Sequence, residues 1–391
     1  MHLTKEEERI YNGECGWANQ TCMKILVRLG ELFNAEKLIP ISSAHVSGVS
    51  YKTLGDTPTE YLKALADAKA KVKVKTTLNP QSFDPEYLGK RLPKHLHEAQ
   101  LNVLKQFERM GLTPSLTCTP YFLEEPTHNA HLAWAESSAV VYANSVLSAW
   151  TNREGGPSAL AAAVIGKTPN YGMHKAENRK PNVLVNLEMR PRNETEFGAL
   201  GICLGKILGD RIPTIPSLRD ASRDDLKQFS AALATTGMAN MFACKNRPEN
   251  KAIEKISVEG RQVRQTIEGL STASTSEPDL VFIGCPHCSL AEVKQIARLV
   301  VHGKKVRAGR EFWVCTSRYV KEKAREHVEK IEGSGGHVLA DVCTVVSWTE
   351  TLGIKTIMTN SAKTAYYAPT LNKAETILTP LEECLTTAFR G

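Results

Sequence analysis

Residues 280–283 have the sequence LVFI, and similar short apolar runs occur at residues 311–314 (EFWV), 337–340 (HVLA) and 354–357 (IKTI). Stretches with the apolar spacing of helices, such as residues 291–301, lie between these runs. Short buried strands that alternate with helices are typical of parallel βαβ units with right-handed crossovers. The last third of the chain is therefore predicted to be a parallel α/β lobe, whose ligands would bind beyond the carboxyl ends of the strands.

Several thiol and polar side chains occupy such strand ends. Cys285, Cys315 and Cys343 each directly follow a predicted strand, and so does the loop that contains Lys363. Earlier in the chain, a further predicted strand ends at Cys118. Three such thiols, Cys118, Cys285 and Cys343, would be able to hold an iron–sulfur cluster, although spacing alone leaves Cys315 as a competitor.

The segment Cys285-Pro286-His287-Cys288 also permits other interpretations. A CxxC pair can be a redox dithiol or half of a zinc site, and the chain would then be a non-catalytic thiol or metal-binding protein. A zinc site would need a second close cysteine pair, which the sequence lacks. We favour one functional cysteine, Cys285, with Cys288 packed as a small apolar residue in the first helical turn.

Composition limits the class of protein. The chain has 391 residues, 42% of them hydrophobic and 23% charged, as expected for a globular protein with a substantial core. The net charge of +7 is spread along the chain and gives little support to nucleic-acid binding. No apolar run reaches the roughly 18 to 20 residues of a membrane span, and the acidic N-terminus does not resemble a signal peptide. We therefore expect a cytoplasmic protein with neither nucleic acid nor membrane as partner, and with unpaired cysteines.

Three regions are expected along the chain. Residues 1–180 are predicted to form an N-terminal α/β region with substrate loops, residues 181–250 a middle α/β lobe, and residues 251–391 the C-terminal α/β lobe. In the first region, residues 135–150 are small and apolar enough to form a buried helix.

Three loops of the N-terminal region offer hydroxyl, amide and backbone N–H groups that bind carboxylate or phosphate oxygens. They are Gly48-Val49-Ser50, Asn79-Pro80 and Ser137-Ser138. Lys363 would add a positive charge. The alternatives are helix caps and turns for the serines and a solvated surface lysine for Lys363. His45 and Arg153 are further candidates, with a structural histidine and a loop-bracing arginine as alternatives.

Seven motifs in this order resemble the large subunit of the aconitase X family. They are AHVSGVSYK at 44–52, CTPY at 118–121, AWAESSAV at 133–140, ANS at 143–145, TNREGGP at 151–157, GCPH at 284–287 and NSAK at 360–363. The likeness extends from Thr4 almost to the C-terminus. It implies an aconitase-like α/β fold of several parallel or mixed lobes around a central iron–sulfur site, without the mobile swivel domain of aconitases.

The resemblance also implies a chemistry. Cys118, Cys285 and Cys343 would ligate a 4Fe–4S cluster with one open iron, a Lewis acid suited to the loss of a hydroxyl group. A separate small subunit would carry the swivel domain and the catalytic base, giving a heterodimer or larger assembly. The expected reaction is dehydration of (R)-5-phosphomevalonate to trans-anhydromevalonate 5-phosphate, a step toward isoprenoids, and the alternative substrate is cis-3-hydroxy-L-proline.

Overall fold

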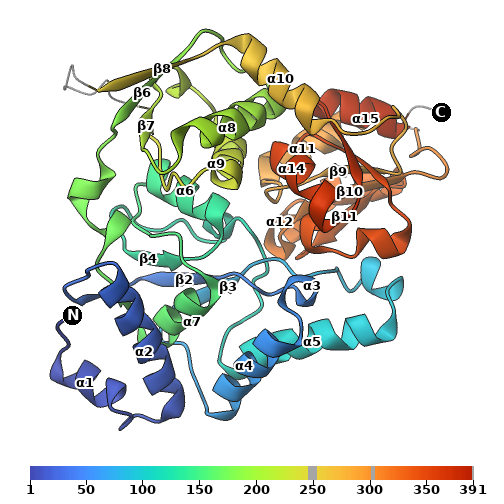
Figure 1. The fold of residues 1–391 in the computed structure, drawn as a ribbon. Coiled ribbons are helices and arrows are strands. Elements are labelled where there is room, and N and C mark those ends of the chain that lie inside the picture. The colour runs from blue at the N-terminus through green and yellow to red at the C-terminus, as the bar shows by residue number, and fades with distance from the viewer. Residues whose placement is uncertain (245–252, 301–303, 390–391) are drawn as a thin grey trace. The chain divides into compact units, whose positions relative to one another are not determined.

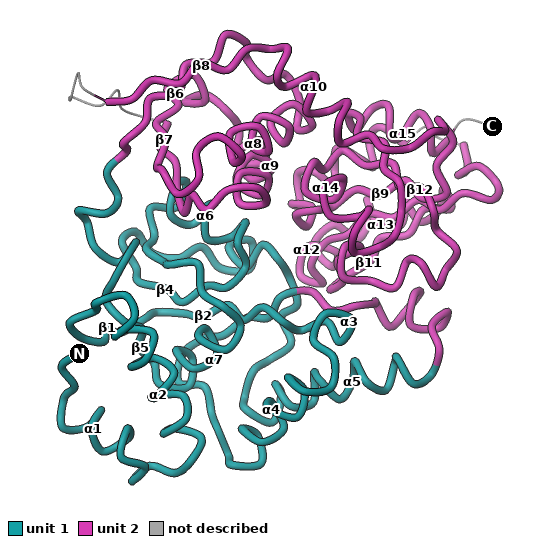
Figure 2. The backbone as a smooth tube through the Cα atoms, viewed as in Figure 1, with its two compact units in different colours: residues 1–79, 94–180 teal, residues 80–93, 181–391 magenta. Residues whose placement is uncertain are grey.

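The computed structural model divides the chain into two compact units, and each unit combines two segments of sequence (Figures 1 and 2). Unit 1 contains Met1–Asn79 and Lys94–Lys180, and unit 2 contains Pro80–Pro93 and Pro181–Gly391. The structure describes residues 1–244, 253–300 and 304–389. The boundary predicted at residue 250 lies outside the described residues.

Unit 1 contains seven α-helices and two small sheets among its described residues. The helices are α1 (Lys5–Tyr11), α2 (Trp17–Leu32), α3 (Tyr51–Leu54), α4 (Asp56–Asp67), α5 (Lys94–Arg109), α6 (Ser137–Ser145) and α7 (Gly156–Ile165). The strands are β1 (Leu38–Pro40), β2 (Ser43–Val46), β3 (Lys75–Leu78), β4 (Leu132–Trp134) and β5 (Lys167–Pro169). β1 and β5 pair antiparallel, whereas β3, β2 and β4 form a parallel sheet in that order.

Local sequence explains where these helices form. α1 begins with a capping box, in which Thr4 and Glu7 each bind the backbone N–H of the other. α2 places Cys22, Met23 and Leu26 in the core of the unit. The predicted helix over residues 135–150 is shorter in the structure, because α6 ends at Ser145. The chain beyond α6 turns back, and Ser148 adopts a positive φ that no helix permits.

Unit 2 contains two parallel sheets and eight helices among its described residues. The helices are α8 (Glu194–Leu208), α9 (Arg223–Thr236), α10 (Gly260–Leu270), α11 (Leu290–Leu299), α12 (Arg318–Lys323), α13 (Arg325–Gly333), α14 (Ala362–Leu371) and α15 (Leu381–Phe389). The smaller sheet has the order β7 (Pro213–Thr214), β6 (Val183–Leu187) and β8 (Glu254–Val258). α8 and α9 lie beside this sheet (Figure 1). The two helices pack closely on each other at Gly201 of α8, where a Cβ atom would lie 2.7 Å from the carbonyl oxygen of Phe229 on α9.

The larger sheet confirms the parallel α/β lobe predicted from the sequence. Its strands are β9 (Leu280–Ile283), β10 (Glu311–Thr316), β11 (His337–Ala340), β12 (Thr356–Thr359) and β13 (Glu375–Leu378), and all of them are parallel. The order is β11-β10-β9-β12-β13, so the chain direction across the sheet reverses beside β9. Parallel sheets bind ligands at such a topological switch point. Cys285 follows β9 and Lys363 begins the helix after β12, so both lie at this point, where the charge of Lys363 acts on Cys285.

Three details of the sequence prediction are wrong. The strand predicted to end at Cys118 is absent, because only Leu116 forms an isolated bridge, and Pro114 and Pro120 cannot donate to a ladder. Cys315 lies inside β10 and does not follow it. The last predicted strand, at residues 354–357, begins two residues later in the structure.

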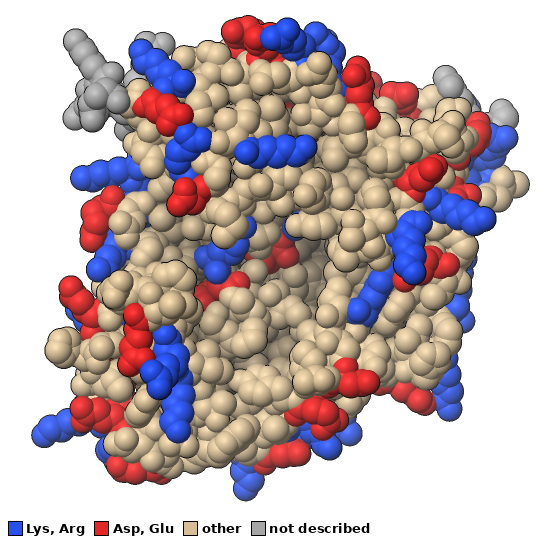
Figure 3. Space-filling model, viewed as in Figure 1, with Lys and Arg blue, Asp and Glu red and all other residues tan. Residues whose placement is uncertain are grey.

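Two further features bear on expectations from the sequence, namely the apolar character of the helices and the distribution of charge. Among the described residues, no helix has both the length and the apolar character needed to cross a membrane. Basic and acidic side chains are intermixed over the face shown in Figure 3.

Candidate active site

Cys285 reaches its position through a glycine that no other residue replaces easily. Gly284 ends the run of β9 with a φ of +121°. A Cβ atom there would lie 2.3 Å from the carbonyl oxygen of Cys315 in β10. The same carbonyl accepts a 2.9 Å hydrogen bond from the backbone N–H of Cys288, and Thr316 Oγ1 donates to the Cys288 carbonyl at 2.7 Å. The Cys285 loop is therefore pressed against the adjacent strand.

The structure brings Cys285 and Cys343 together. A hydrogen bond with the Cys343 thiol, and then the charge of Lys363, lower the pKa of Cys285 to about 6, although burial acts in the opposite direction. Cys285 is 3% exposed. A thiol with this pKa is mostly thiolate at neutral pH, and thiolate is the form that binds metals.

Lys363 is the second residue of α14, and Ser361 is the N-cap of that helix. Ser361 Oγ accepts a hydrogen bond from the backbone N–H of Thr364 at 3.2 Å. Asn360 Oδ1 at this strand end is buried and has no hydrogen-bond partner among the described residues, whereas the Thr364 hydroxyl is one of the groups that lower the pKa of Cys285. Buried polar groups are rarely left unpaired, so this strand end has the character of a ligand site.

Cys288 and Cys315 have a different environment from Cys285. Both are buried, and burial raises the pKa of Cys288 well above its usual value. A protonated, enclosed thiol is typical of a structural cysteine. This supports the interpretation of the CxxC segment in which only Cys285 is functional.

Cys118 belongs to unit 1 and is 6% exposed. It lies between Thr117 and Thr119, whose hydroxyl oxygens are 3.0 Å apart. Within the part of the chain that the structure describes, no three His, Cys, Asp or Glu side chains form a group arranged to hold a metal ion.

The predicted anion loops of unit 1 lie at one edge of the parallel sheet. Gly48-Val49-Ser50 follows β2, Asn79 follows β3, and Ser137 and Ser138 follow β4. Gln100 on α5 fixes the first loop, because its side chain donates to the Val49 carbonyl and accepts from the Tyr51 N–H, both at 2.9 Å. Pro80 is the first residue of unit 2.

A hydrogen-bonded chain that the sequence did not reveal joins two of these loops. Asn79 Nδ2 donates to Glu136 at 2.8 Å, so Asn79 Oδ1 accepts from His45 Nε2 at 3.1 Å. His45 Nδ1 then accepts from the Thr77 hydroxyl at 2.8 Å. Burial lowers the pKa of His45 to about 4, which keeps the ring neutral. His45 therefore orients Asn79. The sequence indicated Glu136 only by its place in the motif before Ser137.

Ser138 of the third loop takes part in a helix cap. Glu136 caps α6, and both the backbone N–H and the hydroxyl of Ser138 donate to Glu136 Oε1, at 3.3 and 2.8 Å. This is the capping alternative for Ser138. Arg153 lies beside β4, where it forms an isolated parallel bridge with Trp134.

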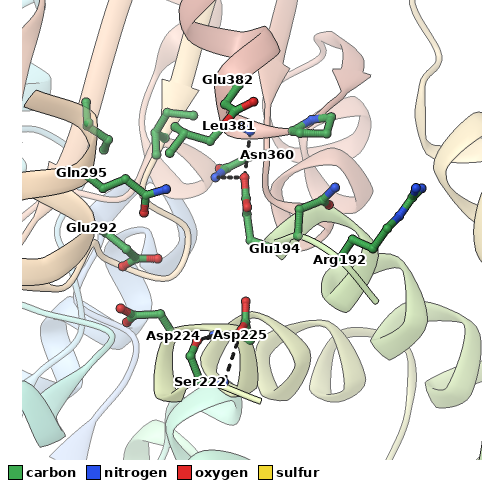
Figure 4. A pocket seen from close by; sticks show the side chains of 14 residues that line it. Arg192, Glu194, Ser222, Asp224, Asp225, Glu292, Gln295, Asn360, Leu381 and Glu382 are labelled. Carbon is green, nitrogen blue, oxygen red and sulfur yellow. Dashed lines mark hydrogen bonds between the residues drawn. The ribbon is translucent and has the colours of Figure 1, made fainter. Parts of the chain in front are cut away.

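Unit 2 also contains a cavity of about 560 Å³ at the ends of β9 and β12 (Figure 4). Glu194 on α8 faces it and accepts hydrogen bonds from Asn360 Nδ2 at 3.1 Å and from the Leu381 N–H at 2.7 Å. Asp224 and Glu292 also line the cavity, whereas Lys363 does not. Its carboxylates make this cavity a poor site for an anionic ligand.

Almost the whole chain is similar to one protein family. The chain matches models of the aconitase X first domain over residues 1–177, the second domain over residues 181–268 and the third domain over residues 278–390. The crystal structure of Thermococcus kodakaraensis aconitase X in its holo-form superposes with a TM-score of 0.92 and 40% sequence identity. The match covers 99% of this chain and 100% of that one.

Two groups of enzymes are similar in sequence. The phosphomevalonate dehydratase large subunit of Methanocaldococcus jannaschii is 45% identical, over 98% of this chain and 99% of that protein. The cis-3-hydroxy-L-proline dehydratase of Pseudomonas aeruginosa is 31% identical, over 98% of this chain but only 69% of that protein. The hydroxyproline enzyme thus contains a long stretch that has no counterpart in this chain.

Proposed function

Because this chain belongs to the aconitase X family, we propose that it is the large subunit of a hydro-lyase that dehydrates (R)-5-phosphomevalonate to trans-anhydromevalonate 5-phosphate. The observation that carries the proposal is the pairing of Cys285 with Cys343 beside Lys363 at the switch point of the larger sheet. It combines soft metal ligands with a positive charge, as a metal-assisted reaction of an anionic substrate requires.

The first part of the proposal concerns the cofactor. Cys118, Cys285 and Cys343 would hold a 4Fe–4S cluster, and the lowered pKa of Cys285 supports this ligand role because iron binds thiolate. When bound, such a cluster supplies a Lewis acid for departure of the substrate hydroxyl. Asn360 Oδ1, which has no hydrogen-bond partner among the described residues, fits a strand end that contacts a ligand.

The second part concerns the substrate. Gly48, Val49, Ser50, Asn79, Pro80, Ser137 and Ser138 would bind carboxylate and hydroxyl oxygens, and Lys363 the phosphate or the carboxylate. His45 supports this role for Asn79, because it holds the amide in one orientation. An amide fixed before the substrate arrives loses less entropy on binding than a free one.

The third part concerns a partner. The phosphomevalonate dehydratase relatives are called large subunits. The hydroxyproline dehydratase matches this chain over only 69% of its own length. Both observations support a small subunit that carries the swivel domain and the catalytic base. No disulfide joins the ten cysteines, all of which belong to the described residues, and this favours a reducing, cytoplasmic location.

An anaerobic reconstitution tests the cofactor and the reaction together. The chain is loaded with iron and sulfide, combined with a candidate small subunit, and assayed with 5-phosphomevalonate, mevalonate and cis-3-hydroxy-L-proline. We expect 5-phosphomevalonate to react far faster than the others. Preferential turnover of the proline would replace the proposed substrate, and full activity without the small subunit would exclude a base on that partner.

A matched pair of cysteine variants tests the ligand assignment. Cys285→Ser should abolish the iron–sulfur absorbance, because serine oxygen is a poor substitute for thiolate at iron, whereas Cys288→Ser should retain it. Loss of the absorbance in Cys288→Ser, or its retention in Cys285→Ser, would show that the wrong thiol of the segment was chosen.

A further inference from the structure

His287 lies between the two cysteine loops of unit 2. It is fully buried, two residues after Cys285. Its Nε2–H donates a 2.8 Å hydrogen bond to the carbonyl oxygen of Val342, the residue directly before Cys343. One imidazole ring therefore connects the loop after β9 with the loop after β11.

The sheet itself provides no such connection. β9 and β11 are not neighbours, because β10 lies between them and pairs with both. Ladder hydrogen bonds thus fix each loop relative to β10 but not relative to the other loop. The bond from His287 to Val342 spans this gap.

A buried lysine holds the same loop from α9. Lys227 has no exposed side-chain surface, and its Nζ donates to the carbonyl oxygen of His287 at 3.1 Å. Burial alone would lower the pKa of Lys227, but the nearby carboxylates of Glu292 and Asp224 raise it, so the ammonium stays charged. Glu292 also accepts from Lys227 and from the Ser289 N–H at the start of α11.

We infer that His287 is a positioning residue that holds the Cys285 and Cys343 thiols at a fixed separation, and that Lys227 braces the His287 backbone. This inference rests on the function proposed above, because it treats the two thiols as metal ligands. Groups that orient metal ligands without touching the metal commonly change metal affinity by about 10- to 100-fold.

The test uses the full chain with three single variants. His287→Leu removes the donor, whereas His287→Gln retains an N–H near the position of Nε2. His174→Leu is the matched control, since His174 is also a buried histidine, with a 2.9 Å hydrogen bond to His131 in unit 1. After anaerobic loading, iron and acid-labile sulfide are measured per chain, and then the rate at which iron passes to a chelator.

We expect His287→Leu to release iron about 10- to 100-fold faster than the unmodified chain. His287→Gln and His174→Leu should both remain close to the unmodified rate. Equal rates for His287→Leu and His174→Leu would overturn the inference, because the effect would then be that of any buried histidine.

Cadmium binding to the unloaded chain separates this inference from the proposed function. Cd²⁺ needs only the thiols, and the part of its thiolate absorbance that is lost in Cys285→Ser reports binding by the Cys285–Cys343 pair. If the unmodified chain takes up no iron and sulfide but binds Cd²⁺ about tenfold or more tightly than His287→Leu does, the cluster proposal fails and the positioning role stands. Equal Cd²⁺ affinity in both chains overturns the positioning role.

The role of Lys227 needs a charge-balanced variant. Lys227→Met alone would leave Glu292 buried beside no cation, so the double variant Lys227→Met with Glu292→Gln removes both charges. We expect this variant also to release iron faster, by about tenfold. Release at the unmodified rate would show that Lys227 does not brace the loop.

Discussion

Substituting Gly284 by alanine should displace the Cys285 loop, and the structure allows the effect to be calculated. The new Cβ would lie 2.3 Å from the oxygen, 2.8 Å from the nitrogen and 3.0 Å from the carbonyl carbon of Cys315. These are backbone atoms of β10, which is held by strands on both sides. The strand cannot move away, so the loop must.

Two costs add at this position. A non-glycine residue at a φ of +121° costs about 1 to 3 kcal/mol. Moving the loop also breaks the buried bond from the Cys288 N–H to the Cys315 carbonyl, which costs about 1 to 3 kcal/mol. We therefore expect a local loss of about 3 kcal/mol or more, equivalent to roughly a 100-fold increase in opening.

Hydrogen exchange followed by mass spectrometry measures this opening in the peptide that contains Cys285 and Cys288, because the Cys288 N–H is the donor of the broken bond. Gly269→Ala is the control, because a Cβ there meets nothing within 4 Å and alanine in a helix is more stable than glycine by about 0.5 to 1 kcal/mol. Gly284→Ala should exchange roughly 100-fold faster in this peptide and hold less iron, while Gly269→Ala does neither. Unchanged exchange and iron content in Gly284→Ala would refute the argument.

Three further predictions concern pH, substrate and ligands. Burial lowers the pKa of His45 to about 4 and of His174 to about 3, against 6.5 for an ordinary histidine, so the unfolded chain binds protons that the folded chain does not. The free energy of unfolding should fall as the pH drops below about 6.5, by about 3 kcal/mol for each histidine by about pH 4. A free energy of unfolding in urea that does not change between these two pH values would contradict this prediction. Lys363→Ala should narrow the preference for 5-phosphomevalonate over mevalonate by roughly 10- to 150-fold, and an unchanged ratio of kcat/KM would remove Lys363 from phosphate recognition. Cys118→Ser and Cys343→Ser should each lower the iron and sulfide content of the loaded chain, and full content in either would exclude that residue as a ligand.

The sequence by itself determined the parallel lobe and placed Cys285, Cys343 and the motif at 360–363 after its strands. Buried strands can be recognised from the local sequence, because a short apolar run such as residues 280–283 alternates with segments that have the apolar spacing of helices. The motifs around Cys285 and Asn360 likewise stand in the sequence and led to the correct family. Periodicity failed near Cys118, where Pro114 and Pro120 flank the predicted strand and only Leu116 forms a bridge.

The sequence favoured Cys285 over Cys288 from their places at a strand end and in a helical turn, but only the tertiary structure supplied the physical cause. The two thiols lie three residues apart, and their pKa values are set by residues distant in the sequence. Cys285 acquires its low pKa from Cys343, which follows β11, and from Lys363 on α14, whereas Cys288 is enclosed away from water. The bond from His287 to Val342 and the alignment of His45, Asn79 and Glu136 depend in the same way on distant segments. Electrostatic interactions and hydrogen bonds act through space at a few ångströms, so these properties exist only once the chain has folded.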